Sequence, residues 1–306
     1  PAPGLYTFAM CGIAGVLDPK RALPAEALRG LARRMSLALA HRGPDGEGLF
    51  VDAGAGLALG HRRLAIIDLS RAGAQPMATG DGRLTLVLNG EIYNFPELRR
   101  LLETSPGFPG WRGTSDTETF LEAVAAWGLE TALDRSRGMF ALALWDARER
   151  TLTLARDRMG EKPLYYALQG GRLTFASELP GILAAPGFSA SVDRGALALL
   201  LRLSCIPAPH GILRGVRKLP AGHLVEISAA GLAGGALPAP KLWWSLRQMA
   251  QDGLMEPFEG TEEQAHEALL RRLRQSVRGQ MVADVPLGAL LSGGVDSSLV
   301  AALMAE

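Results

Sequence analysis

The 306-residue sequence lacks the features of several large classes of protein. Its two cysteines, Cys11 and Cys205, are too few for a disulfide framework, which fits a reducing compartment. No apolar run is long enough to span a bilayer, and residues 1–10 are too short and uncharged for a secretory signal. The formal net charge is only +1, and no basic run is interleaved with aromatic residues. We therefore expect a cytoplasmic protein without a nucleic-acid or membrane partner.

Motifs for common catalytic chemistries are also missing. The five histidines show neither an H-E-x-x-H pattern nor Cys/His ligand spacing, so we expect no structural metal. No G-x-S-x-G sequence marks a serine hydrolase. The lysine of a G-x-x-x-x-G-K-[ST] phosphate loop is absent as well.

The sequence does contain many short apolar runs divided by turn residues, at 12–17, 57–60, 64–69, 84–88, 139–145, 151–155 and 173–177. Residues 84–88 and 139–145 have the composition of buried strands, and the short polar stretch 146–150 predicts a hairpin turn. Apolar residues at helical spacing predict helices over 24–39, 117–127 and 193–203. Many strands with a few long helices predict stacked sheets covered by helices.

The composition changes in the last quarter of the chain, and the length itself suggests two domains. Residues 228–260 are rich in Gly, Ala and Pro and predict a linker. Thr261 to Gln264 has the form of a capping box that opens a long helix. A strand over 287–291, a Gly-rich turn over 292–296 and a helix from Ser297 are then expected. A parallel sheet needs several such units, so we expect the second domain to be incomplete in this chain.

Cys11 directly follows Met10, which we interpret as the true start after an upstream leader. Removal of Met10 would give Cys11 a free α-amine, whose reference pKa of about 7.7–8.0 lies near the thiol value of about 8.5. That amine can accept the thiol proton, so one residue supplies both nucleophile and base. Small residues at Gly12 and Ala14 would let a substrate approach. The plain alternative is a small buried hydrophobe, as most free cysteines are.

Four further polar segments stand at ends of predicted elements, and each also has a plain explanation. They are His41 to Gly46 after a helix, Gly60 to Asp68 with arginines at the mouth of an apolar strand, Asn89 to Asn94 ending the strand 84–88, and Gly113 to Glu118 opening a helix. Asn89-Gly90 is also typical of a hairpin turn, and Asp116 of a helix N-cap. Arg63 is equally typical of a solvated charge.

Together and in order, these segments resemble the class II glutamine amidotransferase domain, most closely that of the glutamine-hydrolysing asparagine synthetases. The resemblance begins at Cys11-Gly12-Ile13-Ala14-Gly15, includes the strings 156–166 and 176–179, and runs to about residue 225. It implies an α+β fold, a four-layer αββα N-terminal-nucleophile hydrolase domain, followed by the first βα unit of an incomplete α/β parallel-sheet ATP-pyrophosphatase domain. The expected boundaries are a leader at 1–10, the amidotransferase domain at 11–227, a linker at 228–260 and the start of the synthetase domain at 261–306.

The resemblance also implies roles for residues near the amino end. Cys11 would form a thioester with glutamine, release ammonia and be freed by hydrolysis to glutamate, without a cofactor. Arg63 would pair with the substrate carboxylate through its planar guanidinium, while Glu91 and Asp116 would bind the α-ammonium. The Asn89 side chain and the Gly90 N–H would form the oxyanion hole. The backbone of the segment after Arg63 would flank the substrate, at Leu64, Ala65, Ile66 and Ile67.

Near the carboxyl end, a Gly-rich turn between an expected strand and helix resembles the pyrophosphate loop of ATP pyrophosphatases. Backbone N–H groups at such a turn can cradle an anion. The resemblance implies that ATP adenylates aspartate, that ammonia reaching it internally displaces AMP, and that Asp296 helps to bind Mg²⁺. Leu290 would contact adenine through its backbone. The loop residues implied to bind ATP are Ser292, Gly293, Gly294, Val295, Asp296 and Ser297.

Some positions depart from the family pattern, and two alternative functions stay open. Cys205 and His210 stand where Tyr and Arg are expected, and Pro180 stands where Lys is usual. We expect Cys205 to be a core thiol. The tryptophans at 243–244 are expected to be packing residues, with a role in a tunnel wall as the alternative. The alternatives are a related amidotransferase with another carboxylate acceptor, or a non-catalytic remnant. The resemblance implies glutamine, aspartate and ATP as substrates and a homodimer as the assembly.

Overall fold

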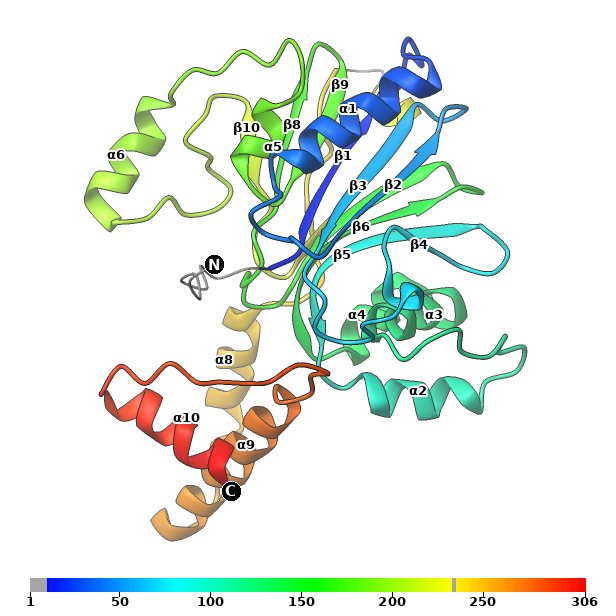
Figure 1. The fold of residues 1–306 in the computed structure, drawn as a ribbon. Coiled ribbons are helices and arrows are strands. Elements are labelled where there is room, and N and C mark those ends of the chain that lie inside the picture. Colours follow the sequence, from blue (N-terminus) through cyan, green and yellow to red (C-terminus); the bar gives the residue numbers. More distant parts are fainter. Residues whose placement is uncertain (1–9, 233–234) are drawn as a thin grey trace, which may run out of the picture.

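The computed structural model describes residues 10–232 and 235–306, so the expected leader lies outside the described residues except for Met10. Two six-stranded sheets pack against each other, and neighbouring strands in each described sheet are antiparallel. Helices cover the outer face of each sheet (Figure 1). No helix within the described ranges is both long and apolar enough to cross a membrane.

The first sheet carries the strand that begins at the predicted nucleophile. Its order is β10-β8-β9-β1-β3-β2, with bounds β1 (Gly12–Leu17), β2 (Gly46–Asp52), β3 (Leu57–Arg63), β8 (Tyr165–Gln169), β9 (Arg172–Ala176) and β10 (Val216–Lys218). Successive residues of β1 point to opposite faces. Ile13 and Leu17 therefore join the core between the sheets, while Ala14 and Val16 pack under the outer helices. These helices are α1 (Ala25–Leu37) and α5 (Leu179–Leu183).

The second sheet has the order β12-β11-β7-β6-β5-β4. Its bounds are β4 (Met77–Ala78), β5 (Leu84–Ile92), β6 (Gly138–Asp146), β7 (Thr151–Arg156), β11 (His223–Ser228) and β12 (Lys241–Leu242). Its outer face is covered by α2 (Phe95–Glu103), α3 (Asp116–Trp127) and α4 (Leu129–Arg135). Val87 faces the core between the sheets, whereas Leu86 and Leu88 pack toward the helices. The αββα fold class is thus confirmed.

Strand β5 continues past residue 88, where the sequence analysis ended it. Asn89 pairs with Ala141 and Gly90 with Phe140 in the ladder to β6. Asn89 and Gly90 are therefore in a strand interior, and neither the strand end nor the alternative hairpin turn is correct. Asn89 and Gly90 interrupt the apolar pattern typical of a buried strand because they line a cavity instead of packing in the core.

The segment 64–69, expected as a strand, forms a loop instead. Strand β3 ends at Arg63, so the two arginines finish one strand rather than open another. A short 3-10 helix, η1 (Arg71–Gly73), follows the loop. The guanidinium of Arg63 donates to backbone carbonyls of this loop, which is why the apolar run does not need a strand partner.

The structure of the carboxyl-terminal part differs from the prediction in three places. The segment 228–260 holds α7 (Ala229–Leu232), β12 and α8 (Leu246–Met255), where a plain linker was expected. The capping box at Thr261 is confirmed, and it opens α9 (Glu262–Gly279). Residues 287–291 form no strand, since a strand needs a neighbour to pair with and none lies beside them in the described ranges. Helix α10 (Val295–Ala305) begins two residues before the expected start.

Two side-chain expectations have opposite outcomes. Cys205 is exposed, so a core thiol is wrong. It follows helix α6 (Arg194–Leu203), whose C-cap Ser204 has a left-handed conformation. Trp243 is a packing residue, as expected, because its ring stacks on Phe140 with centroids 6.3 Å apart.

Candidate active site

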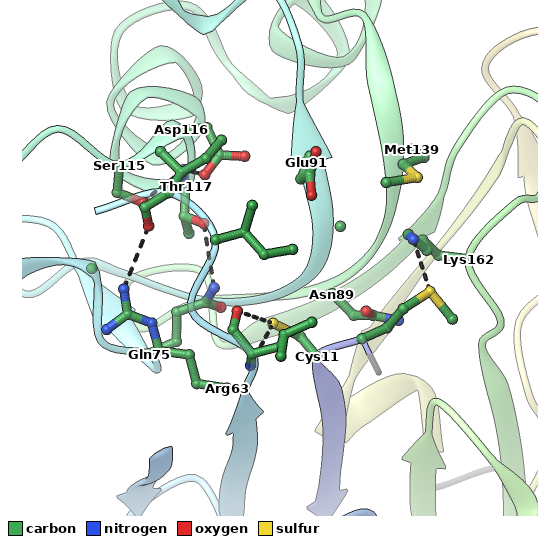
Figure 2. Close-up of a pocket in the computed structure, with 16 residues that line it drawn as sticks. Cys11, Arg63, Gln75, Asn89, Glu91, Ser115, Asp116, Thr117, Met139 and Lys162 are labelled. Atoms are coloured by element: carbon green, nitrogen blue, oxygen red, sulfur yellow. Dashed lines mark hydrogen bonds between the residues drawn. The ribbon is translucent and has the colours of Figure 1, made fainter. Parts of the chain in front are cut away.

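A cavity of about 180 Å³ lies where the amino end of β1 meets β5 and the start of α3 (Figure 2). It is lined by almost all the residues that the sequence analysis assigned to a glutamine site, although those residues come from four separate segments. These are Cys11, Arg63, Leu64, Ile66, Ile67, Asn89, Gly90, Glu91 and Asp116. Ala65 does not line the cavity, and its N–H donates to Asp45 instead.

The Cys11 sulfur is held against the first residue of the loop after β3. It lies 3.4 Å from the backbone nitrogen of Leu64 and 3.5 Å from the Leu64 carbonyl oxygen. Burial raises the pKa of the thiol to about 11, and the charge of Asp116 acts in the same direction. The Leu64 N–H and the cations Arg63 and Lys162 oppose this rise. The thiol of a chain that retains Met10 is therefore protonated at neutral pH, and its reaction requires a base.

The described residues that line the cavity include no histidine to serve as that base. His61 lies in β3 and is fully buried. Its Nε2 is 3.3 Å from the Leu88 carbonyl oxygen, to which the Nε2–H tautomer donates. Burial lowers the pKa of His61 to about 3, so the ring is neutral at pH 7. The position of His61 is structural, since it connects the two sheets.

Asn89 is fully buried, and neither its Nδ2 nor its Oδ1 has a partner among the described residues. A buried polar group left unpaired costs about 1–3 kcal/mol. Its neighbour Gly90 has φ +154° and no room for a side chain, because a Cβ would lie 2.0 Å from the Met139 carbonyl oxygen. The cavity wall thus includes the Asn89 amide, which has no partner among the described residues, and only glycine fits at the next position.

Two carboxylates line the cavity across from the sulfur (Figure 2). Asp116 accepts hydrogen bonds from the backbone nitrogens of Ile92 and Thr117, each 2.8 Å long. Burial nevertheless raises its pKa to about 6. Burial and the nearby charge of Asp116 also raise the pKa of Glu91, while Lys162 opposes that rise. A ligand ammonium would relieve the repulsion between these acids, so this wall suits a cation.

The Arg63 side chain forms hydrogen bonds with the backbone of the loop between β3 and η1. Its Nη1 donates to the Ser70 carbonyl oxygen at 2.9 Å, and its Nη2 donates to the carbonyl oxygens of Ile67 and Asp68. No hydrogen bond from Arg63 Nε to another described residue is seen, and Arg63 lines the cavity, so its guanidinium can also donate to a carboxylate ligand there.

Several residues that line the cavity were not predicted from the sequence, and Gln75 and Lys162 are the most important of them. Gln75 donates from Nε2 to Thr117 Oγ1 at 3.3 Å and accepts from the Leu88 nitrogen at 2.6 Å. It therefore ties β5 to the start of α3, and no local pattern marked it. Lys162 belongs to the string 156–166 that carried the resemblance, so that string was the available signal.

A family model for the glutamine amidotransferase domain matches residues 10–243, which is more than half of the chain. The chain belongs to the glutamine amidotransferase family. A second model, described as asparagine synthase, matches residues 268–306.

Curated relatives agree with this family, and solved structures show a similar fold. An asparagine synthetase [glutamine-hydrolyzing] of Bacillus subtilis is 35% identical over 301 residues, covering 97% of this chain and 45% of the relative. A putative asparagine synthetase of Mycobacterium bovis is 38% identical, covering 96% and 45%. The chain spans about half the length of these relatives. The glutamine PRPP amidotransferase of B. subtilis has a similar fold, with a TM-score of 0.54, 18% identity and coverage of 77% of this chain and 50% of that one.

The segment that the amidotransferase chain was expected to use for ATP lies apart from the cavity. None of Leu290 and Ser292 to Ser297 lines it. The hydroxyls of Ser292 and Ser297 are 2.9 Å apart at the start of α10. Gly294 is the N-cap of that helix, and Gly293 has φ +82°. The backbone at this helix start is therefore open to an anion.

Proposed function

We propose that the chain hydrolyses glutamine and is the glutaminase half of an asparagine synthetase. The observation that carries this proposal is the buried amide of Asn89, which has no partner among the described residues and lines the same cavity as the Cys11 sulfur. A buried amide without a partner is suited to a charge that develops during reaction. The two carboxylates and Arg63 supply complementary charges for an amino-acid substrate.

The proposed reaction starts once the residues up to Met10 are removed. The α-amine of Cys11 takes the thiol proton, and the sulfur attacks the side-chain amide carbon of glutamine. Asn89 Nδ2 and the Gly90 N–H stabilise the oxyanion. The C–N bond then breaks as the nitrogen receives the proton, which releases ammonia and leaves a thioester. Water attacks the thioester, forms glutamate and restores the thiol.

Substrate orientation follows from the charges around the cavity. Glu91 and Asp116 bind the α-ammonium, and Arg63 binds the α-carboxylate. The backbone from Leu64 to Ile67 flanks the substrate, with Ile66 and Ile67 lining the cavity directly. Because the sulfur also contacts Leu64, nucleophile and substrate would be aligned by the same loop.

The synthetase half is proposed from the relatives' names and from the open start of α10. The residues there fit a nucleotide phosphate, since the loop is rich in Gly and Ser and precedes a helix of eleven residues. Asp296 would supply one carboxylate to Mg²⁺, which commonly takes its other ligands from phosphate and water. ATP would activate aspartate for attack by ammonia. A homodimer in the cytoplasm is part of the same proposal.

An amidotransferase with another carboxylate acceptor is the second candidate. One relative of comparable identity, from Penicillium rubens, is named an amidase and is 34% identical over 305 residues. Mass-spectrometric identification of the aminated product, made by the longest natural form of the protein, separates the two candidates.

Intact-mass analysis combined with a glutaminase assay tests the proposal. We expect a mature chain that starts at Cys11 and releases glutamate from glutamine. The Cys11→Ala variant should keep its fold, measured by circular dichroism, and release none. A chain that starts at Cys11 yet releases no glutamate would support the non-catalytic alternative, and glutamate release by Cys11→Ala would reject the mechanism.

A further inference from the structure

Lys162 is a buried lysine beside the nucleophile, and the proposed mechanism gives it no role. Its side chain is only 6% exposed, although lysine is almost never fully buried without a partner. It lines the same cavity as Cys11, and its Nζ lies 2.9 Å from Met10 Sδ (Figure 2). The ammonium therefore lies in the cavity of the Cys11 sulfur, on the side of Met10, the residue whose removal would free the α-amine of Cys11.

The backbone of Lys162 is held firmly. Its nitrogen donates to Asp157 at 3.0 Å, and its carbonyl oxygen accepts from Arg156 Nε at 2.6 Å. Asp157 also accepts from the backbone nitrogens of Met159 and Glu161. These hydrogen bonds fix the backbone of the loop before β8, and so the point from which the Lys162 side chain enters the cavity.

Lys162 forms no ion pair with a carboxylate of the described residues. Within the part of the chain that the structure describes, no carboxylate lies within ion-pair distance of its Nζ. Glu91 on β5 and Glu161 on its own loop are near enough to oppose the effect of burial, which lowers the pKa of Lys162.

The other cation near this junction is already paired. Arg42, after α1, donates from Nε to the Cys11 carbonyl oxygen at 2.9 Å and from Nη1 to Glu178 at 2.5 Å. Arg63 on β3 and Asp116 on α3 also act on the Cys11 sulfur, with opposite signs. Among these groups, Lys162 alone presents an ammonium to the Met10 side of Cys11.

We propose that the Lys162 ammonium keeps the α-amine of processed Cys11 unprotonated and its sulfur ionisable at neutral pH, as a positioning residue for the N-terminal nucleophile. The inference rests on the proposed function. While Lys162 is protonated, its positive charge disfavours a second ammonium in the same cavity and favours a thiolate, so both effects increase the reactive form of Cys11. Glutamine itself need not touch the lysine.

The test measures pH profiles of the full chain processed to Cys11, in a Cys205→Ser background because Cys205 is exposed and would also react. Two readouts are taken for wild type, Lys162→Met and Lys162→Arg: kcat/KM for glutamine and the rate of Cys11 alkylation by iodoacetamide. We expect the midpoint of both profiles to rise by about one pH unit in Lys162→Met, which is about a tenfold loss at pH 7 that recovers at higher pH. Lys162→Arg should keep the wild-type midpoint.

Two other results would overturn the inference. An equal loss at every pH, with unchanged midpoints, would show a merely structural role. A higher KM with unchanged midpoints would show that the lysine contacts substrate. If Lys162→Met does not fold, Lys162→Gln provides a second neutral side chain for the same comparison. The alkylation profile needs no turnover, so it tests Lys162 even if wild type fails to hydrolyse glutamine, which would reject the proposed function separately.

Discussion

The backbone nitrogen of Asp68 donates a 2.7 Å hydrogen bond to the carboxylate of Asp284, which lies 216 residues further along the chain. The backbone nitrogen of Asp284 donates in turn to the Ile66 carbonyl oxygen at 2.8 Å. Ile66 lines the cavity, and the Asp68 carbonyl oxygen accepts from Arg63. The segment after α9 is therefore bonded to the loop that forms one wall of the candidate glutamine site.

We expect Asp284→Ala to raise KM for glutamine about fivefold with little change in kcat. One net hydrogen bond is worth about 1 kcal/mol, and its loss would loosen the loop that places Arg63. Steady-state glutaminase kinetics measure this effect. The matched control is Asp252→Ala, since Asp252 is an exposed aspartate on α8 whose side chain, among the described residues, hydrogen-bonds only to Gln248 in its own helix. Equal KM values for Asp284→Ala and the control would show that the contact does not support the site.

We expect Asn89→Leu to lower kcat by about 10²–10³-fold while making the fold more stable by about 1 kcal/mol. The amide is lost as an oxyanion donor, but a buried unpaired group is also removed. The free energy of unfolding in urea and the glutaminase rate measure the two effects. The same change at Asn94 serves as a control, because that side chain is paired with Arg135 and Arg137 and its loss should destabilise. A less stable Asn89→Leu protein would mean that the native amide is already satisfied.

We expect glutamine binding to release protons near pH 6. Burial raises the pKa of Asp116 to about 6, so this acid is partly protonated there, and a bound α-ammonium would drive it to the ionised form. As pH falls below about 6, the affinity should fall because the neutral acid no longer attracts the ammonium. Isothermal titration of Cys11→Ala in buffers of different ionisation enthalpy measures the protons. Release of the same number by a Cys11→Ala chain that also carries Asp116→Asn would exclude this carboxyl as the source.

We expect Gly90→Ala to destabilise the protein by about 3 kcal/mol or more. The added Cβ would meet the Met139 carbonyl oxygen at 2.0 Å and the Phe140 Cα at 2.6 Å, and both belong to the paired strand backbone. Overpacking of this kind typically costs about 1–3 kcal/mol, and more when backbone must move. Thermal denaturation compares it with Gly80→Ala, where an added Cβ meets nothing within 4 Å. Similar melting temperatures for the two variants would contradict the expectation.

Residues with regular apolar spacing were predicted well because their periodicity is local. The strand at Gly12–Leu17 and the helices at Ala25–Leu37 and Asp116–Trp127 are examples. Asn89 and Gly90 interrupt the apolar pattern within β5, since the positions of a strand that line a cavity need not be apolar. Resemblance to the family found most lining residues. Local pattern could not find Gln75, whose role depends on contacts with Leu88 and Thr117.

The segments 64–69 and 287–291 failed as strands for a different reason. An apolar run becomes a strand only when a neighbour offers hydrogen bonds, and this depends on tertiary structure. The first run instead wraps the Arg63 guanidinium. The second is followed by the exposed start of α10, and no strand among the described residues pairs with it.

The most direct test of the account compares glutamate release by a chain whose first residue is Cys11 with release by a chain that retains Met10. If the α-amine of Cys11 is the base, the first chain hydrolyses glutamine and the second is slower by about 10²-fold or more, as expected for loss of a general base. Equal rates, with the retained Met10 verified by intact mass, would contradict the claim that one residue is both nucleophile and base.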